Sequence, residues 1–138
     1  MAGYSGTPLV KKLGLADRRV VLLHEPPDFR TKLVDLPETT ELLTDYEGSV
    51  DVVVVFAKAR ADFEAALPQA GREVFPAGAI WIAWPKRASK IPTDMTEDVV
   101  RDVVLPLGLV DNKVCAIDEV WSGLRVVWRK ELRSGPPP

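Results

Sequence analysis

The chain has 138 residues, 46% of them apolar, and its 18 basic and 20 acidic side chains give a net charge of −2. We therefore expect one globular domain over residues 1–132 with a disordered tail over 133–138, and the charge balance argues against nucleic-acid or membrane partners. No apolar stretch approaches the roughly 20 residues that span a bilayer, and the N-terminus lacks a signal-peptide pattern, so we expect a cytoplasmic protein.

The first half of the chain alternates short helical segments with strands. A Thr-Pro pair favours a short helix over Thr7–Leu13. Continuous β-branched and leucine runs predict strands over Arg19–His24 and Val50–Phe56, each buried on both faces. Between these strands we expect a short helix over Asp28–Leu33 and then mostly loop over residues 34–49.

The next helix and strand follow the same alternation. Apolar positions near a 3.6 period predict a helix whose inward side chains are Phe63, Leu67, Ala70 and Val74. Pro68 interrupts this pattern and is expected to split or kink the helix. A third strand is predicted over Ala79–Trp84, with Trp81 and Trp84 on opposite faces of the sheet.

The C-terminal part predicts one more helix and a hairpin. Asp94-x-x-Glu97 has the spacing of a capping box and opens a helix of inward valines that ends near Gly108. Strands over Lys113–Asp118 and Leu124–Lys130 are joined tightly through the segment around Trp121, which indicates an antiparallel pair. The alternation as a whole predicts an α/β three-layer sandwich of about five mostly parallel strands in the order 1-2-3-5-4.

Two resemblances follow from particular segments. Ala70–Trp84, with its turn Phe75-Pro76-Ala77-Gly78, and Gly108–Asp111 before a hairpin resemble the second half of the Rossmann-like class I methyltransferase fold. The whole chain resembles a bacterial family of small proteins of unknown function. The matching words are Gly3-Tyr4-Ser5-Gly6-Thr7-Pro8-Leu9, Lys12-Leu13-Gly14, Trp84-Pro85-Lys86, Pro92-Thr93-Asp94 and Trp121-Ser122-Gly123. This resemblance implies the fold and no particular activity.

The cofactor site of true methyltransferases is not evident in the sequence. Their first strand runs into a glycine-rich turn, whereas here the turn is His24–Asp28 with two prolines that lack amide donors. The acidic residue that binds the ribose should end a second strand about 20 residues on, but Glu38–Leu43 does not have the pattern of a buried strand. We therefore expect a degenerate S-adenosylmethionine site and no cofactor.

Candidate site residues gather where the parallel strands end, because ligands of open α/β sheets bind at that edge. His24 and Glu25 follow the first strand and are candidates for acid–base catalysis, although the sequence favours polar residues that merely close a strand, because no second catalytic partner is evident. Lys86, Arg87 and Lys90 follow the third strand, and with Thr93 at a helix start they are candidates for holding a phosphate or carboxylate, against which the nearby Asp94 carboxylate acts.

Other candidates lie elsewhere in the chain. The segment with Tyr4, Ser5 and Thr7 caps the first helix and is expected near the same crevice. Trp121, expected to be exposed in the hairpin turn, is a candidate partner contact. Cys115 is the single cysteine, which fits a small core residue and allows neither a disulfide nor a multi-cysteine zinc site, so we expect no metal.

These residues support three hypotheses of function. The first is a non-catalytic binding or regulatory module, a degenerate methyltransferase-like domain that holds a small anionic ligand or a protein partner. The second is a divergent enzyme, which uses either S-adenosylmethionine or His24 and Glu25. The third is a structural subunit of a complex with Trp121 at its contact. The oligomeric state does not follow from the sequence.

Overall fold

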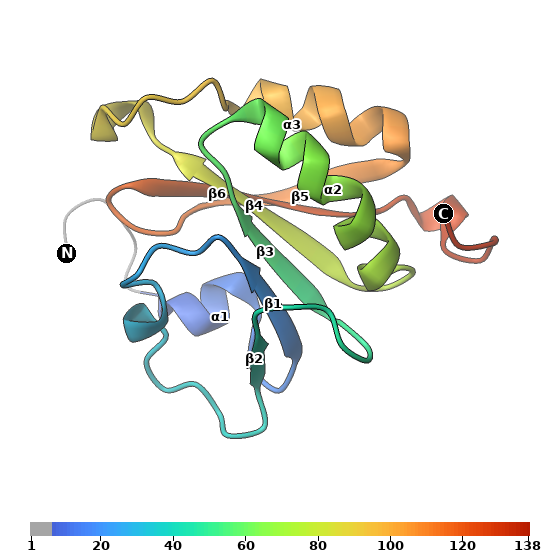
Figure 1. Cartoon of the computed structure of the whole chain (residues 1–138). Coiled ribbons are helices and arrows are strands. Elements are labelled where there is room, and N and C mark those ends of the chain that lie inside the picture. Colours follow the sequence, from blue (N-terminus) through green and yellow to red (C-terminus); the bar gives the residue numbers. More distant parts are fainter. Residues whose placement is uncertain (1–6) are drawn as a thin grey trace.

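The computed structural model describes residues 7–138, which form a mixed sheet between two layers of helices and loops (Figure 1). In this part of the chain the sheet has six strands, in the order β2-β1-β3-β4-β6-β5. The strands are β1 (Arg19–Leu23), β2 (Glu41–Leu43), β3 (Val52–Phe56), β4 (Ala79–Pro85), β5 (Leu109–Ala116) and β6 (Trp121–Trp128). The helices are α1 (Leu9–Leu13), α2 (Arg60–Val74) and α3 (Glu97–Val104), with 3-10 turns η1 (Arg30–Lys32), η2 (Arg87–Ser89), η3 (Leu105–Leu107) and η4 (Lys130–Leu132).

The strand order confirms the predicted topology and adds one strand. Strands β2, β1, β3 and β4 are parallel, while β6 runs antiparallel to both β4 and β5. The five predicted strands are β1, β3, β4, β5 and β6, and their order is the predicted 1-2-3-5-4. The ladder between β5 and β6 contains a bulge between Asp111 and Lys113.

Strand β2 corrects the expectation that residues 34–49 are mostly loop. It pairs in parallel with β1, with Arg19 opposite Glu41 and Val21 opposite Leu43. Its residues are exposed or half-buried, so the strand lacks the apolar run that marked its neighbours. The Arg19 guanidinium holds this edge together, because it pairs with the Glu41 carboxylate at 2.6 Å and donates to the Ser49 carbonyl at 2.7 Å.

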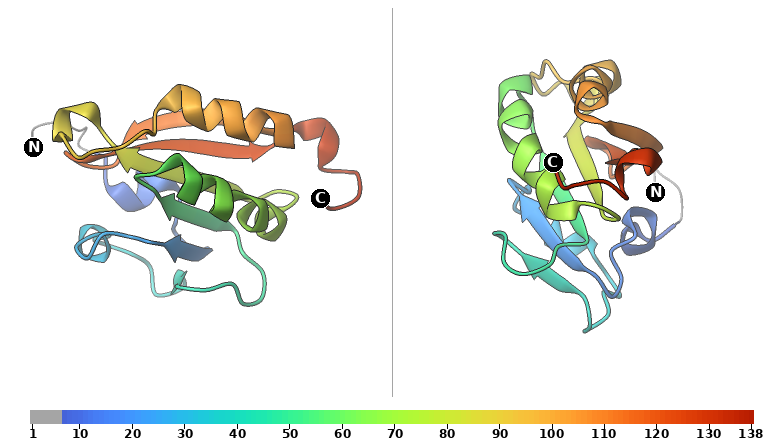
Figure 2. Two further views of the ribbon diagram at one scale, coloured as in Figure 1. Left: turned by 45° about the horizontal axis from the view of Figure 1, so that its top comes forward. Right: turned by 90° about the vertical axis from the view of Figure 1, so that its right-hand side faces the viewer.

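The two faces of the sheet carry separate hydrophobic clusters. Figure 2 shows α1 on the side of the sheet away from α2 and α3. Trp84 packs in the cluster under α2 and α3, whereas Trp81 packs in the cluster on the α1 side, as their spacing predicted. The Trp81 indole Nε1 donates to the Leu13 carbonyl at 2.9 Å, which fastens α1 to the middle of the sheet.

Helix α2 contains Pro68 without a break. The helix spans Arg60–Val74, so the expected split at the proline does not occur. Pro68 is exposed, and the four predicted inward positions are buried on the opposite side of the helix: Phe63, Leu67, Ala70 and Val74. The proline ring therefore faces solvent and leaves the packed stripe of the helix intact.

The start of α3 differs from the predicted capping box. The N-cap is Thr96, whose hydroxyl accepts the Val99 amide at 3.1 Å. Asp94 instead accepts the first amide of α2, from Arg60, at 2.7 Å. Sequence spacing could not reveal this, because the bond joins residues that are 34 positions apart. Asp94 thus compensates the positive end of a different helix from the one predicted.

Gly78 is expected to tolerate no side chain. A Cβ at this position would lie 2.6 Å from the Asp51 carbonyl oxygen and 2.9 Å from that of Val74, so the turn into β4 would have to move. We expect Gly78→Ala to lower the free energy of unfolding by about 2–4 kcal/mol, measured by urea denaturation. Gly14→Ala is the comparison, because a Cβ there meets nothing within 4 Å and only the backbone conformation at φ +67° is strained. A smaller loss for Gly78→Ala than for Gly14→Ala would contradict this packing.

Candidate ligand pocket at the carboxyl edge of the sheet

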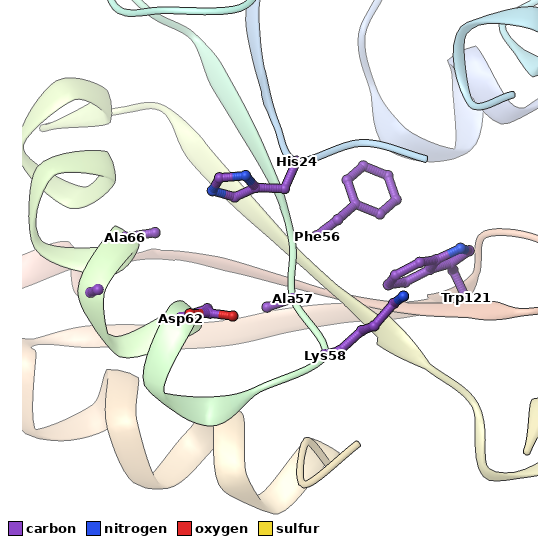
Figure 3. A pocket seen from close by; sticks show the side chains of 8 residues that line it. His24, Phe56, Ala57, Lys58, Asp62, Ala66 and Trp121 are labelled. Atoms are coloured by element: carbon purple, nitrogen blue, oxygen red, sulfur yellow. The ribbon is translucent and has the colours of Figure 1, made fainter. Parts of the chain in front are cut away.

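An open pocket of about 530 Å³ lies where the parallel strands β1 and β3 end (Figure 3). β1 is flanked by β2 on one side and β3 on the other, so this is the point where the chain switches direction along the sheet. Open α/β sheets bind ligands at such points. The pocket is lined by His24, Phe56, Ala57, Lys58, Asp62, Ala65, Ala66 and Trp121.

The apolar wall of the pocket is a row of aromatic rings. Trp121 packs edge-on against Phe56 at a centroid distance of 5.2 Å, and Phe56 packs against the buried Phe29 at 4.9 Å. Trp121 was expected to be exposed in a hairpin turn, and this placement is wrong. It is the first residue of β6, opposite Pro85 of β4, and only 9% of it is exposed. A contact between Trp121 and a partner protein stays a prediction.

The true hairpin turn, Ile117–Val120, is held by the buried Asp118. Its Oδ1 accepts the amides of Val120 and Trp121, both at 2.8 Å, and its Oδ2 accepts the Lys32 ammonium of η1 at 2.5 Å. Burial acts to raise the pKa of Asp118, but the hydrogen bonds from Lys32 and the two amides outweigh it and the pKa is lowered. Asp118 therefore fixes the position of Trp121 in the pocket wall.

The polar side chains of the pocket come from three elements. His24 follows β1 in the left-handed region at φ 60°, Lys58 follows β3, and Asp62 lies in the first turn of α2. Figure 3 shows the Lys58 side chain directed toward the Trp121 ring, with His24 and Asp62 around the same space. The pocket thus combines an aromatic wall with a few polar groups of both charges, which is the usual make-up of small-ligand sites.

Glu25, the predicted partner of His24, is engaged elsewhere. Its carboxylate pairs with Arg30 of η1 at 2.9 Å. His24 is exposed, and its ring makes no side-chain hydrogen bond within residues 7–138, whereas Glu25 accepts the Arg30 guanidinium. The two residues stand next to each other in the chain, but the structure does not bring them together as an acid–base pair.

The basic loop that follows β4, residues 86–95, is attached at both ends to the walls of the pocket. At its start the Lys86 amide donates to the Val120 carbonyl at 2.7 Å, next to Trp121. At its end the Thr93 hydroxyl donates to the Lys58 carbonyl at 2.5 Å, and Asp94 caps α2. Lys86, Arg87 and Lys90 do not line the pocket itself, and Arg87 and Lys90 are exposed.

The remaining sequence-predicted candidates lie apart from this pocket. Tyr4 and Ser5 are outside the described residues, and Thr7 lines a different cavity beside Cys115. Cys115 is half-buried, and burial raises the pKa of its thiol despite the nearby lysine charges. The sequence reasoning missed Lys58 and Asp62. The available signal was their position after the buried parallel strand β3, with Lys58 in the connection and Asp62 in the first turn of α2, since that edge is where ligands bind.

Within residues 7–138 no helix has both the length and the apolar character to cross a membrane. The same part of the chain contains no cluster of three or more His, Cys, Asp or Glu side chains with metal-binding geometry.

The fold is shared with solved methyltransferases. A protein described as a type 11 methyltransferase from Sulfolobus solfataricus superimposes with a TM-score of 0.60 at 12% identity, over 93% of this chain and 92% of that chain. The magnesium protoporphyrin IX methyltransferase of Synechocystis PCC 6803, solved with bound S-adenosylmethionine, gives a TM-score of 0.56 at 11% identity, over 88% and 74%. A methyltransferase from Aquifex aeolicus gives 0.53 at 13% identity, over 89% of each chain. The chain therefore has the class I methyltransferase fold.

The sequence also identifies the family. A family model described as "Protein of unknown function (DUF3052)" matches residues 25–130, so the chain belongs to this family. The match confirms the predicted relation to a family of unknown function on a methyltransferase-like fold. No curated protein was found to match the sequence.

Proposed function

We propose that the chain is a non-catalytic binding module that holds a small anionic ligand with a planar part in the pocket at the carboxyl edge. The observation that carries this proposal is the pocket of about 530 Å³ lined by Trp121, His24, Lys58 and Asp62 at the switch point of the sheet. An aromatic wall favours a flat ligand, because ring faces provide large apolar contact with little loss of side-chain freedom. Lys58 then supplies the charge for an anionic group.

The basic loop supports the anionic character of this ligand. Its ends are fastened to Val120 and Lys58, so Lys86, Arg87 and Lys90 belong to a segment that is tied to the pocket walls. In this proposal Lys58 contacts the ligand and the three loop cations raise its local concentration through their field. Thr93 acts as the anchor of the loop, since its hydroxyl is already bonded to the Lys58 carbonyl.

A divergent enzyme is the alternative, and strand β2 is the observation that favours it. Asp45 lies two residues beyond β2, near the position where the fold's ribose-binding carboxylate is expected, and His24 has a glycine-like φ after β1. The two prolines at 26 and 27 act against this alternative, because they remove two amide donors from the turn. Glu25 does not orient His24 for acid–base work, since it pairs with Arg30.

Tryptophan fluorescence tests the proposed site, because Trp121 lines the pocket whereas Trp81, Trp84 and Trp128 do not. We expect adenosine 5′-monophosphate, used as a planar anionic probe, to change the emission of the wild type. Trp121→Phe should remove that change, and Lys58→Gln should weaken binding about tenfold, the usual effect of one charge-assisted hydrogen bond. Adenosine, the uncharged probe, should be insensitive to Lys58→Gln.

Lys130→Gln is the matched control, since it removes the same charge from the exposed η4 turn. An equal loss in this control would mean that general charge, not the pocket, attracts the probe. Binding of S-adenosylmethionine with methyl transfer to any acceptor would favour the enzyme. No response to adenosine monophosphate, adenosine or S-adenosylmethionine would contradict the small-ligand proposal and favour a subunit of a complex.

A further inference from the structure

A second group of cations surrounds a small cavity at the other end of the parallel strands. The cavity has a volume of about 170 Å³ and is bordered by the turns that precede β3 and β4, through Asp51 and Gly78. Its basic side chains come from α1, the turn before β1 and the β5–β6 pair: Lys11, Lys12, Arg18, Lys113 and Arg125. A single carboxylate, Asp51, borders it among the described residues, and its Oδ2 accepts the Arg19 amide at 2.8 Å.

These cations lie close enough together to repel one another, which destabilises the folded chain. Lys113 of β5 is directly opposite Arg125 of β6 in the antiparallel ladder, where like charges destabilise a sheet. Arg18 is close enough to act on Arg125: burial first and the Arg18 charge second lower the pKa of the Arg125 guanidinium. No ion pair between residues 7 and 138 involves Arg18, Lys113 or Arg125. A bound anion would relieve this repulsion.

Two lysines of the group are held in place by the fold. The Lys12 ammonium donates to the Ala116 carbonyl at 3.0 Å, and the Lys113 ammonium donates to the Lys12 carbonyl at 2.9 Å. These bonds join α1 to β5 across 101 or more positions of sequence. A lysine ammonium carries three donors, so Lys113 can keep this bond and still meet an anion. Lys12 and Lys113 are therefore held in place between α1 and β5.

We propose that this cationic cavity is a second binding site, for a small phosphate-bearing ligand, and that it works independently of the pocket at the carboxyl edge. The volume is far larger than the roughly 15 Å³ that one water needs, and it is small enough to select a compact group. Arginine presents a planar fork of donors that matches phosphate oxygens in a bidentate way, and Arg18 and Arg125 supply two such forks. A neighbouring cavity of about 460 Å³ shares Lys11, Lys12 and Lys113, so the rest of the ligand has room there.

The test measures phosphate binding at constant ionic strength, so that general screening does not vary between samples. We expect inorganic phosphate and pyrophosphate to raise the Tm of the full chain by a few degrees and pyrophosphate to broaden its ³¹P resonances, with pyrophosphate the tighter ligand. Arg18→Gln and Arg125→Gln should each weaken pyrophosphate binding about tenfold. The same variants should leave the Tm without phosphate unchanged or higher, because each removes a repelling charge.

Arg72→Gln is the matched control, since Arg72 is exposed in the last turn of α2, on the other face of the sheet. The proposal is overturned by the absence of a pyrophosphate effect in the wild type, or by an equal loss in Arg72→Gln. It is also overturned if succinate, a dianion without a phosphoryl group, stabilises the chain as much as phosphate does. Trp121→Phe should bind pyrophosphate normally, which separates this site from the pocket at the carboxyl edge.

Discussion

Replacement of Trp81 by alanine is expected to lower the free energy of unfolding by about 3–5 kcal/mol, as for other large aromatic side chains removed from a core. Trp81 is fully buried in the middle of β4 and packs in the cluster on the α1 side of the sheet. Its indole also fastens α1 to the sheet through the bond to the Leu13 carbonyl at 2.9 Å. The substitution therefore creates a cavity and leaves a buried carbonyl without its donor.

Trp81→Phe separates these two contributions. Phenylalanine fills most of the space but cannot donate a hydrogen bond, so we expect a loss of about 1–3 kcal/mol. Urea denaturation, followed by far-ultraviolet circular dichroism, measures both variants. Val114→Ala is the control, because Val114 is 58% exposed and should change the free energy by less than about 0.5 kcal/mol. A loss below about 1 kcal/mol for Trp81→Ala would contradict the described core.

Asp118→Ala is expected to destabilise the chain by about 2–4 kcal/mol. The substitution removes the acceptor for the Val120 and Trp121 amides and for the Lys32 ammonium. Breaking a buried pair costs about 3–5 kcal/mol, but Lys32 is 37% exposed and regains water, which reduces the loss. Asp118→Asn keeps an oxygen for the two amides, so it should cost only about 1 kcal/mol. Equal losses for the two variants would contradict the role of the amide bonds.

The pH dependence of the unfolding free energy gives a second measure of how much the Asp118 carboxylate stabilises the fold. Because folding lowers the pKa of Asp118, its charged form stabilises the native state above the ordinary value of 3.8, and this stabilisation is lost as the pH falls through the lowered pKa. The difference in unfolding free energy between wild type and Asp118→Asn should therefore be largest near neutral pH and shrink below about pH 4. Denaturation curves between neutral and acid pH measure it. A difference that grows in acid would contradict the lowered pKa.

The sequence allowed the centre of the fold to be predicted because its strands have continuous apolar runs. β1, β3 and β4 are buried on both faces, and such runs are recognised without knowledge of the neighbours. The inward side of α2 was also predictable, since its buried residues follow the helical period. These local patterns, together with the handedness of crossovers, were sufficient to give the order of the five main strands.

The features that were mispredicted depend on contacts between distant residues. β2 exists because Arg19 and the exposed edge of β1 hold it, and its own residues carry no strand pattern. Trp121 lies in the pocket wall and not in a turn because Asp118 and Lys32 set the length of the hairpin. No spacing rule in the sequence contains such information.

The sequence predicted the edge of the sheet at which the candidate pocket lies, but not most of the residues that line it. The carboxyl edge follows from the parallel strands, and His24 and the basic loop were expected there from their position after β1 and β4, but of these only His24 lines the pocket. Lys58 and Asp62 were missed because the stretch from the end of β3 to the first turn of α2 has no distinctive sequence pattern. Their significance comes from the approach of Trp121, which lies more than fifty positions later in the chain.

The two outermost strands of the sheet also bear on whether the sheets of two chains can pair edge to edge. β2 has only three residues, and β5 carries a bulge between Asp111 and Lys113, with Lys113 exposed on that border. A short strand offers few unpaired amides and carbonyls, while a bulge and a lysine interrupt the regular row that a second chain would need for pairing. Both borders therefore resist growth of the sheet into an intermolecular one. Deletion of Asn112, which removes the bulge, should therefore make this border, where Val114 is already 58% exposed, more prone to aggregation.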